Sequence, residues 1–515
     1  MVGGNTSIYL RIPFTAQAGA NYASLKLRMK YDDGFVAYLN GMEVARRNAG
    51  GTAGTPLAYN ASGTDHPDAQ ATVFEDIDIS AFKNLLLAGN NVLSIQGLNS
   101  SNTSTDLLIL PELDATTVVS QTVGFMNPAT PGAINGTASL GFLAEPVMSV
   151  THGFFNAAFP VTISDATLGV TIRYTTDDST PTETNGTLYT GPITISGTVD
   201  LRAAAFKTGY TTSDIETETY IFLSDILTQS TSTPPGFAST GTNGQVLNYG
   251  MDPTIVNSPV WGPQMLAALQ SIPSISIVTD QANLWDPATG IYVNALNDGQ
   301  DWERPASVEL INPDGTTGFQ INAGLRIRGG YSRNDYDPKH AFRLFFNDDY
   351  DGELVYPLFG DEGVDTFKKI DLRTDQNYSW SGEGDSRMTF LRDTFSRDTL
   401  RDLGQPYTRG RDYFLYLNGQ FWGIYQTEER PDADYAESYF GGDDDNYDVV
   451  KANADNSAYN LTATDGNTDA FLQMWTLANQ VAAAPTQAQR YDIFMQMQGL
   501  NPDGTRNTSY PVLLD

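Results

Sequence analysis

At 515 residues the chain is too long for one hydrophobic core, and it is expected to divide into about three or four domains. Its 61 acidic and 29 basic side chains give a formal charge of −32, which excludes nucleic acids and anionic membrane surfaces as favoured partners. The absence of cysteine excludes disulfides, thiolate metal sites and cysteine nucleophiles.

The few histidines and the lack of long apolar stretches argue against two further classes, zinc proteins with several histidine ligands and membrane-spanning proteins. The three histidines, His66, His152 and His340, lie far apart in the sequence, so no multi-histidine zinc site is expected and each is predicted to be a surface or packing residue. No stretch approaches the ~20 apolar residues that span a membrane, and no charged-then-apolar leader opens the chain. We therefore expect no membrane insertion, and a signal peptide that had been removed would leave no trace.

Residues 1–115 are predicted to form an antiparallel β-sandwich. Runs that alternate apolar and polar residues, such as "SLKLRMKY" and "GFVAYLNGMEVARR", are separated by Gly, Asn and Asp turns. "YDDGFVAYLNGMEVARRN" and "GNNVLSIQGLN" resemble the galactose-binding-like jelly-roll modules of large secreted bacterial proteins, which often bind sugars and often serve as spacers. Asp32 and Asp33 could hold calcium, but a turn-capping role is the preferred interpretation because aspartate favours turns.

A second sandwich is predicted over residues 150–223, between two linkers. Residues 116–149 and 224–270 are rich in Gly, Pro, Ser and Thr, which is typical of connecting segments. Between them, "RYTTDDSTPT", "LYTGPI" and "LRAAAFKTGYTTS" resemble, in order, the fibronectin-like module at the end of chitobiases and other hexosaminidases. In that family the module is an accessory, so no chemistry is assigned to it here.

The next segment carries basic residues inside predicted strands. Arg326 and Arg328 lie two apart on one strand face, a Gly-Gly turn follows, and Lys339 and Arg343 lie on the return strand. Such a hairpin could cradle an anion, because backbone amides approach closely and the side chains supply charge. A hairpin with a basic exposed face is an equally good interpretation.

A helix is predicted in "DSRMTFLRDTFSRDTLRDLG", capped by Ser386 and stopped by Gly404. Its apolar residues have helical spacing: Met388, Leu391, Phe395 and Leu403. Asp393 and Arg397 are four residues apart and can pair along the helix, so a surface covered with ion pairs is the default interpretation of its charges.

Residues 416–432, "YLNGQFWGIYQTEERPD", predict a hairpin around an Asn-Gly turn that ends in a burst of charge. The functional question is whether the hairpin delivers its carboxylates to a reaction or ends in a solvated loop. We expect Glu428 to point inward, and Glu429, Arg430 and Asp432 to cap and solvate the exit of the hairpin.

Separated motifs over about residues 270–455 resemble the CotH family, the bacterial spore-coat protein H type of atypical protein kinase. In order they are "RIRGGYSRNDYDPKHAFRLFF", "YPLFG", "KKIDLR", "FLRDTFSRDTL", "YLNGQFWGIYQTEERPDADYAESYFGG" and "YDVVKAN". The resemblance implies an extracellular or cell-surface kinase that uses ATP and Mg²⁺. It also predicts an α+β kinase-like domain over residues 271–515, after two all-β sandwich modules, one jelly-roll-like and one fibronectin/Ig-like.

The resemblance and the basic strands together suggest a set of cofactor-binding residues: Arg328, Lys339, Arg343, Arg392, Asp393, Glu428 and Lys451. The resemblance implies that Lys339 faces nucleotide phosphates, that Arg392 and Asp393 line the site, that Glu428 is a pocket carboxylate, and that Lys451 is a late pocket residue. Phosphoryl transfer needs cations on the phosphates and carboxylates for magnesium and for the hydroxyl nucleophile.

The sequence departs from the family after Lys451. The family's metal-binding and catalytic aspartates lie downstream in a "WDxD"-like region, and no such aspartate pair follows here. Two helices are predicted instead, "AQRYDIFMQMQ" and one with Phe471, Met474 and Trp475 on one face, and both are interpreted as core or cover. The kinase-like domain is therefore expected to be truncated, and its catalytic and metal-ligating residues stay unassigned.

Three functions follow from these patterns. The first is a CotH-like kinase that transfers phosphate from ATP to hydroxyl groups of extracellular proteins. The alternative is a non-catalytic extracellular scaffold or glycan-binding protein built from the accessory modules. Glycoside hydrolysis is a third and weaker hypothesis, because among 61 acidic residues a carboxylate pair is uninformative and an accessory module does not define a site.

Overall fold

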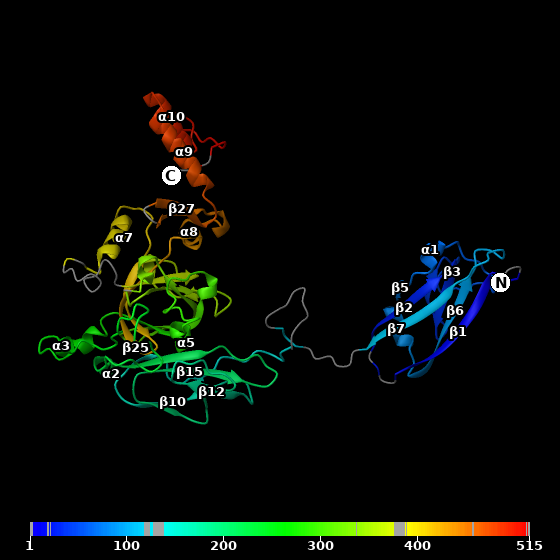
Figure 1. Cartoon of the computed structure of the whole chain (residues 1–515), viewed down its shortest axis with the longest axis horizontal. Helices are drawn as coiled ribbons and strands as arrows, with labels where there is room; N and C mark the ends of the chain where they lie inside the picture. Colours follow the sequence, from blue (N-terminus) through cyan, green and yellow to red (C-terminus); the bar gives the residue numbers. More distant parts are fainter. Residues whose placement is uncertain are drawn as a thin grey trace. The chain divides into compact units, whose positions relative to one another are not determined.

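The computed structural model describes residues 4–17, 20, 22–117, 124–126, 138–335, 337–374, 387, 389–455, 458–510 and 512. The chain forms two compact units, Met1–Ala138 and Ser139–Asp515 (Figure 1). Among the helices in the described ranges, none is both long enough and apolar enough to cross a membrane.

The first unit is a β-sandwich, as the sequence predicts. One sheet has the order β1 (Ser7–Ala16), β6 (Gly89–Leu98), β3 (Gly34–Leu39) and β4 (Met42–Arg47). The other has the order β5 (Glu75–Asp78), β2 (Tyr22–Tyr31) and β7 (Ile109–Thr117); helix α1 (Asp68–Ala71) and a 3₁₀ helix (Ser80–Leu85) complete the unit. Alternate residues of β2, Leu25, Leu27 and Met29, are fully buried because side chains alternate between the two faces of a strand.

The second unit begins with the fibronectin-like sheets. A five-stranded sheet has the order β13 (Thr187–Leu188), β12 (Thr171–Thr175), β15 (Val199–Phe206), β16 (Glu216–Phe222) and β9 (Gly153–Phe155). Two small sheets pair β10 (Phe159–Val161) with β14 (Ile193–Ile195) and β11 (Ile163–Ser164) with β8 (Val147–Met148). Ile221 of β16 packs with Phe414 and Tyr416 in one buried cluster, which joins this layer to the strands that follow.

Those strands close a barrel. Its order is β17 (Ser274–Val278), β18 (Arg304–Ile311), β19 (Thr317–Arg328), β20 (Ala341–Phe345), β23 (Lys369–Arg373), β25 (Gln420–Glu428) and β24 (Gly410–Leu417). Neighbours are antiparallel, except that β17 and β24 pair in parallel and complete the ring. Leu325, Phe342 and Leu372 fill the interior, so the residues that alternate with them point outward.

The remaining elements of the second unit surround the barrel or follow it in the chain. The helices are α2 (Leu223–Leu227), α3 (Pro253–Val256), α4 (Met265–Ala268), α5 (Gln281–Trp285), α7 (Arg392–Asp402), α8 (Ala433–Phe440), α9 (Asp469–Ala483) and α10 (Gln487–Met497). The 3₁₀ helices are Gly262–Gln264, Gln300–Trp302, Tyr331–Arg333, Gly360–Glu362 and Asp444–Asn446. Two hairpins pair β21 (Leu354–Val355) with β22 (Thr366–Phe367) and β26 (Val449–Asp455) with β27 (Ala458–Asp465).

Both Tyr-Leu-Asn-Gly sequences form the predicted hairpin turn. Asn40 and Gly41 have φ of 48° and 90°, and Asn418 and Gly419 have φ of 47° and 69°. Two successive positive φ values define a type I′ turn, whose twist matches that of the flanking strands.

The structure differs from the sequence prediction over residues 224–270. Phe237 and Tyr249 from this segment are buried in the barrel core, and Ile226 is buried where the fibronectin-like layer meets the barrel. The Ser, Thr, Pro and Gly content produces irregular backbone, but isolated aromatic residues still bury their side chains. The segment is therefore part of the second unit.

The predicted helices α7, α9 and α10 are present, and they differ in how far their apolar residues are buried. Helix α7 begins at Arg392 and is followed by Gly404 with a φ of 69°, so the predicted stop is confirmed; Ser386 and Met388 lie outside the described residues. Phe395 of α7 is 71% exposed, which agrees with a surface helix. Trp475 of α9 is 59% exposed and does not lie in a core, whereas Met495 and Met497 of α10 are buried. The spacing predicts the helices correctly, but it does not show what their apolar faces contact.

Candidate functional site

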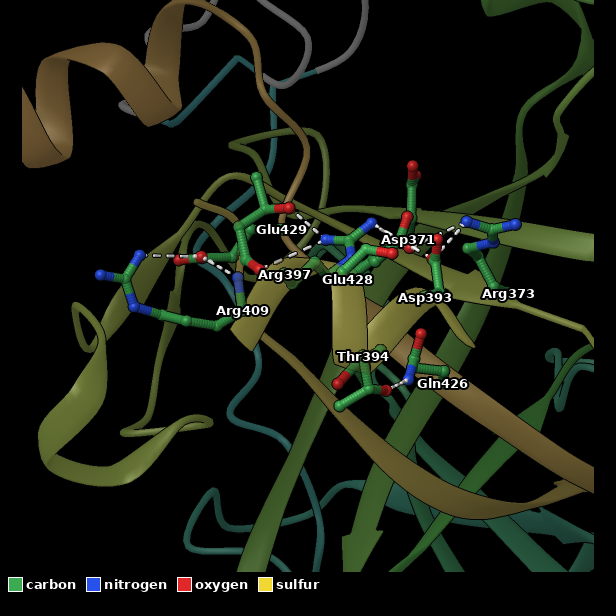
Figure 2. A network of polar contacts seen from close by, with 12 residues as sticks. Asp371, Arg373, Asp393, Thr394, Arg397, Arg409, Gln426, Glu428 and Glu429 are labelled. Atoms are coloured by element: carbon green, nitrogen blue, oxygen red, sulfur yellow. Dashed lines mark hydrogen bonds and ion pairs between the residues drawn. The ribbon is translucent and has the colours of Figure 1, made fainter. Parts of the chain in front are cut away.

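Charged side chains gather on the outer face of the barrel, where β19, β20, β23 and β25 lie side by side. Arg328 comes from β19, Arg343 from β20, Asp371 and Arg373 from β23, and Glu428 from the end of β25. Because side chains alternate along a strand, the apolar neighbours of these residues point into the barrel and the charged ones point out. Helix α7 adds Asp393 and Arg397 to the same face (Figure 2). We call these residues the arginine–carboxylate network.

Asp371 is one centre of the network. Its side chain is 2% exposed and accepts a bidentate pair of bonds from Arg343, from Nε at 2.5 Å and from Nη2 at 2.9 Å. Nη2 of Arg328 lies 2.9 Å from the same carboxylate. The strand register explains this meeting, because Arg343 pairs with Asp371 across β20 and β23.

Glu428 is the other centre. Arg397 contacts its Oε1, and Nη1 of Arg373 lies 3.2 Å from that oxygen. Asp393 is held by the same two arginines, at 3.5 Å from Nη2 of Arg397 and in close contact with Nη1 of Arg373. Nearby, Nε2 of Gln426 donates to Oγ1 of Thr394 at 2.5 Å, which ties α7 to β25 (Figure 2). The predicted pair of Asp393 and Arg397 therefore exists, but it faces the barrel.

The network has more cationic than anionic groups and spare donors. Its guanidinium groups belong to Arg328, Arg343, Arg373 and Arg397, and its carboxyl groups to Asp371, Asp393 and Glu428. Nε of Arg328 and Nε of Arg397 are buried and have no hydrogen-bond partner. Buried donors without partners are costly, so these atoms favour an added acceptor such as an anion oxygen.

The two carboxyl groups at α7 differ in proton affinity. Burial raises the pKa of Glu428 to about 7, and a hydrogen bond with Asp393 adds to this against the opposing arginines. Burial also acts to raise the pKa of Asp393, but its hydrogen bond with Glu428 and the charges of Arg373 and Arg397 lower it overall. Near neutral pH Glu428 is therefore present in both its protonated and its ionised form, beside an ionised Asp393.

Glu429 and Asp432 are not solvated, contrary to the sequence expectation, whereas Arg430 is partly exposed. Glu429 and Asp432 are each 4% exposed. Glu429 lies on the opposite side of the strand end from Glu428, where its Oε2 is 3.1 Å from Nη1 of Arg409 and Tyr439 donates to its Oε1. Asp432 does cap α8, as predicted, by accepting from the N–H of Tyr435. Arg409 and Tyr439 contact Glu429, and Lys369 contacts Asp432, so both acids are paired within the fold.

A small cavity of about 190 Å³ lies beside Glu429 and Asp432. Lys369 contributes to its lining and contacts Asp434 at 2.5 Å and Asp432 at 3.2 Å. Lys368 binds Asp434 at 2.9 Å on the same side. Since each lysine is neutralised by carboxylates, this cavity has less spare positive charge than the arginine–carboxylate network.

The network brings together four of the seven predicted site residues: Arg328, Arg343, Asp393 and Glu428. Lys339 instead lies near Gly423, where an added Cβ would be 3.0 Å from its Nζ. Gly423 is five residues before Glu428 on β25, roughly 16 Å away along a strand. Arg392 is exposed on the first turn of α7, and Lys451 is exposed on the β26–β27 hairpin.

Sequence reasoning missed Asp371, Arg373 and Arg397 as members of the site. The motif "KKIDLR" contains the first two, on either side of Leu372. This alternation of charged and apolar residues indicates a strand with Asp371 and Arg373 on the same face, and it could have predicted their place in the site. The spacing of Arg397 and Asp393 along the helix instead predicts an exposed ion pair. Only the docking of α7 on the barrel shows that it reaches Glu428.

The described residues fit some of the expected ligands better than others. The spare guanidinium donors fit the phosphates of a nucleotide. The carboxylates of the network do not fit magnesium in this arrangement, because arginines already engage Asp371, Asp393 and Glu428.

In the first unit, Asp33 has the predicted turn role, with a φ of 62° and a bond from the N–H of Ser100 at 2.6 Å. Calcium at Asp32 stays a prediction.

Two histidines are packing residues, as predicted. His66 stacks on Tyr31 with ring centroids 4.4 Å apart. His340 is 4% exposed, and burial lowers its pKa to about 4, so it is neutral at physiological pH. The third, His152, is also buried, but its ring lies beside the carboxyl groups of Glu218 and Glu309.

The fold and the network define a multidomain, β-rich chain with an arginine–carboxylate site on the face of a barrel. Residues 325–498 match the CotH kinase protein family, and residues 161–220 match the Fn3 associated family. The resemblance to CotH proteins is therefore confirmed over this region, as is the fibronectin-like character of the second module. The region includes every member of the network.

Other similarities are weaker. No curated protein matches the chain. A Faecalibacterium prausnitzii β-glucuronidase is 13% identical and has a TM-score of 0.12, with 48% of this chain and 40% of that chain covered. A Dictyoglomus thermophilum β-glucuronidase is 10% identical and has a TM-score of 0.12, with 49% of this chain and 43% of that chain covered. The fibronectin(III)-like modules of Clostridium thermocellum CbhA are 9% identical and have a TM-score of 0.12, with 42% of this chain and 85% of that chain covered. Scores this low support no statement about fold or activity, and the chain spans less than half of either glucuronidase.

Proposed function

We propose that this chain is a secreted or cell-surface CotH-type kinase that transfers phosphate from ATP to hydroxyl groups of extracellular proteins. The barrel, α7 and α8 then belong to an α+β kinase-like domain. The match of residues 325–498 to the CotH kinase protein family supports the general activity. The ATP donor, the acceptor and the extracellular location are our inferences.

The observation that carries the proposal is the arginine–carboxylate network. Four guanidinium groups converge on one face, and two of them keep a buried Nε without a partner. Phosphoryl transfer depends mainly on positioning the phosphates and on neutralising their charge, and planar guanidinium groups match phosphate oxygens in geometry. Arg328 and Arg397 are the arginines with donors available for this role.

Glu428 has the properties of a general base. Its pKa of about 7 lets it accept a proton at neutral pH, and Asp393 is the hydrogen-bonded neighbour that helps to raise this pKa. A bound nucleotide supplies the phosphoryl group, and Glu428 would take the proton from the acceptor hydroxyl. Arg373 and Arg397 hold the carboxylate in position. No residue is assigned to magnesium.

Transfer of radiolabelled phosphate from ATP to candidate acceptor proteins tests the proposal. We expect Glu428→Gln to lower the rate by about 10²-fold or more, because general base catalysis typically contributes that much. Arg401→Ala is the matched control, since Arg401 is on the same helix but is 40% exposed and pairs with Asp398 and Glu362, outside the network. Equal loss in both variants, or no transfer by the unmodified chain to any acceptor, would contradict the proposal.

A further inference from the structure

A buried polar cluster lies where the fibronectin-like layer meets the barrel, away from the arginine–carboxylate network. His152 immediately precedes β9, Glu218 is on β16 of the same sheet, and Glu309 is on β18 of the barrel. The side chains of His152 and Glu218 are each 5% exposed, and that of Glu309 is fully buried. The cluster therefore joins two layers of the second unit through groups that rarely occur in a dry interior.

The three side chains converge on one small volume. Nδ1 of His152 lies 3.0 Å from Oε2 of Glu218 and 3.3 Å from Oε1 of Glu309. One ligand atom from each residue lies within 4.8 Å of the others. In a tetrahedral zinc site with bonds of about 2.1 Å, neighbouring ligand atoms are about 3.4 Å apart, so this spacing is close to that of a metal site.

His152 has no hydrogen-bond partner of normal geometry. Both ring nitrogens are buried, and neither makes such a bond, although Nδ1 is close to two carboxylates. Nearly all buried polar groups are satisfied, so a 95% buried imidazole whose Nδ1 lies near two carboxylate oxygens without a well-directed hydrogen bond points to a missing ligand between them. This observation is independent of the spacing of the cluster.

The cluster also has more carboxyl groups than cationic groups. Glu218 and Glu309 both face His152. Glu216 hydrogen-bonds to Glu218, and Glu145 hydrogen-bonds to Glu216, and each of these bonds between carboxyl groups requires a proton. Burying unpaired carboxylates costs free energy unless a cation or protons neutralise them. A divalent cation would provide that charge where the side chains converge.

A second set of contacts orients one carboxylate. Oε1 of Glu309 accepts from the N–H of Thr219 at 2.8 Å, and the hydroxyl of Thr219 contacts Oε2. That hydroxyl is in turn 2.8 Å from Oγ of Ser276, on the barrel strand β17. Ligating carboxylates are commonly held by such outer hydrogen bonds, which fix their direction toward the ion.

We propose that His152, Glu218 and Glu309 bind one divalent transition-metal ion of the zinc type, which fastens the fibronectin-like layer to the barrel. The donor set, one imidazole nitrogen with carboxylate oxygens, suits zinc and similar ions, whereas calcium and magnesium prefer oxygen ligands alone. The role is structural, since the ion would lie between two buried layers and would link residues far apart in the chain.

Cobalt binding to the full chain, freed of metal by a chelator, tests the proposal. We expect one equivalent of Co²⁺ to bind with the strong visible absorption of a four-coordinate site, and zinc to displace it. His152→Gln and Glu309→Gln should each abolish this absorption. His340→Gln is the matched control, because His340 is an imidazole that is 4% exposed in the same unit but bonds the carbonyl of Ser332, outside the proposed donor set, and it should leave the absorption unchanged.

X-ray absorption at the zinc edge of the loaded, unmodified chain gives a result that does not depend on variants that fold poorly. We expect one imidazole and oxygen ligands at about 2.0–2.1 Å. A shell of oxygen alone would overturn the proposal, because it would place the ion on acidic groups elsewhere, such as Asp443 to Asp445. Failure of the unmodified chain to bind one equivalent would also overturn it, and would leave His152 as an imidazolium paired with two carboxylates.

Discussion

At the scale of single residues, the neighbouring acids Glu428 and Glu429 are buried in two different environments. They are consecutive, so their side chains leave the strand end on opposite sides. Glu428 meets Arg373 and Arg397, and Glu429 meets Arg409. The sequence predicts that Glu428 points inward. The burial of Glu429 could not be predicted, because it depends on Arg409, which only the fold brings near.

The Arg409–Glu429 pair should contribute strongly to stability. The guanidinium group lies over the ring of Tyr439, at 3.9 Å from its centroid, and its side chain is 10% exposed. We expect Arg409→Ala to lower the free energy of unfolding by about 3–5 kcal/mol, because Glu429 would stay buried without its cation. Arg401→Ala removes pairs with Asp398 and Glu362, but Arg401 is 40% exposed and Glu362 keeps Arg411 as a partner, so the variant should cost less than about 1 kcal/mol. Equal losses in urea denaturation of the two variants would contradict this account.

The pKa of Glu428 predicts that stability depends on pH. Because burial raises this pKa from 4.5 to about 7, the folded state binds a proton that the unfolded chain releases between these values. The contribution of this group to the free energy of unfolding should therefore fall by about 2 kcal/mol as the pH rises from about 5 to about 7. Chemical denaturation at both pH values should show this part of the fall missing in Glu428→Gln. If the variant kept the full pH dependence, the assignment would be wrong.

At the scale of elements, the Asn418–Gly419 turn helps to close the barrel. Oδ1 of Asn418 accepts from the N–H of Thr279 at 2.9 Å, and its Nδ2 donates to the carbonyl of Thr279 at 2.8 Å. Thr279 directly follows β17, which pairs in parallel with β24. Hence the residue that forms the turn also ties the hairpin to the strand that completes the ring.

The two Tyr-Leu-Asn-Gly hairpins allow this role to be measured. We expect Asn418→Ala to lower the free energy of unfolding of the second unit by about 2–4 kcal/mol, because it leaves two buried backbone groups of Thr279 unpaired. Asn40→Ala is the matched control in the first unit, where the equivalent side chain is exposed and water can replace its bonds. Denaturation of the full chain, followed for each unit, should show the smaller loss for Asn40→Ala.

The elements also show what sequence patterns can and cannot predict. Alternation and Asn-Gly turns predict the strands of the first sandwich and the 416–432 hairpin, because both signals are local. Closure of the barrel depends on pairing Ser274 with Phe414 across a long stretch of chain, which no local pattern specifies. The network has the same limit: Arg328, Arg343, Asp393 and Glu428 could be proposed from motifs, but Asp371 and Arg397 required the strand register and the docked helix.

At the scale of the whole molecule, the chain consists of two compact units with separate cores. Thermal unfolding of the full chain should therefore show two transitions. Leu27→Ala creates a cavity in the first core and should lower only one transition, while Leu415→Ala in the barrel should lower only the other, since each such cavity costs about 2–5 kcal/mol. Calorimetry of the full chain checks this, and a shift of both transitions in either variant would contradict independent folding.

The measurement that most directly tests the central claim is calorimetric titration of ATP with Mg²⁺ into the full chain. The proposed phosphate site predicts saturable binding that weakens by about tenfold or more in Arg328→Ala and in Arg397→Ala, because a lost charge-assisted hydrogen bond costs about 1.5–3 kcal/mol. Arg401→Ala should bind as the unmodified chain does. Absence of binding by the unmodified chain, or equal affinity in all the variants, would contradict the claim that the arginine–carboxylate network binds a nucleotide.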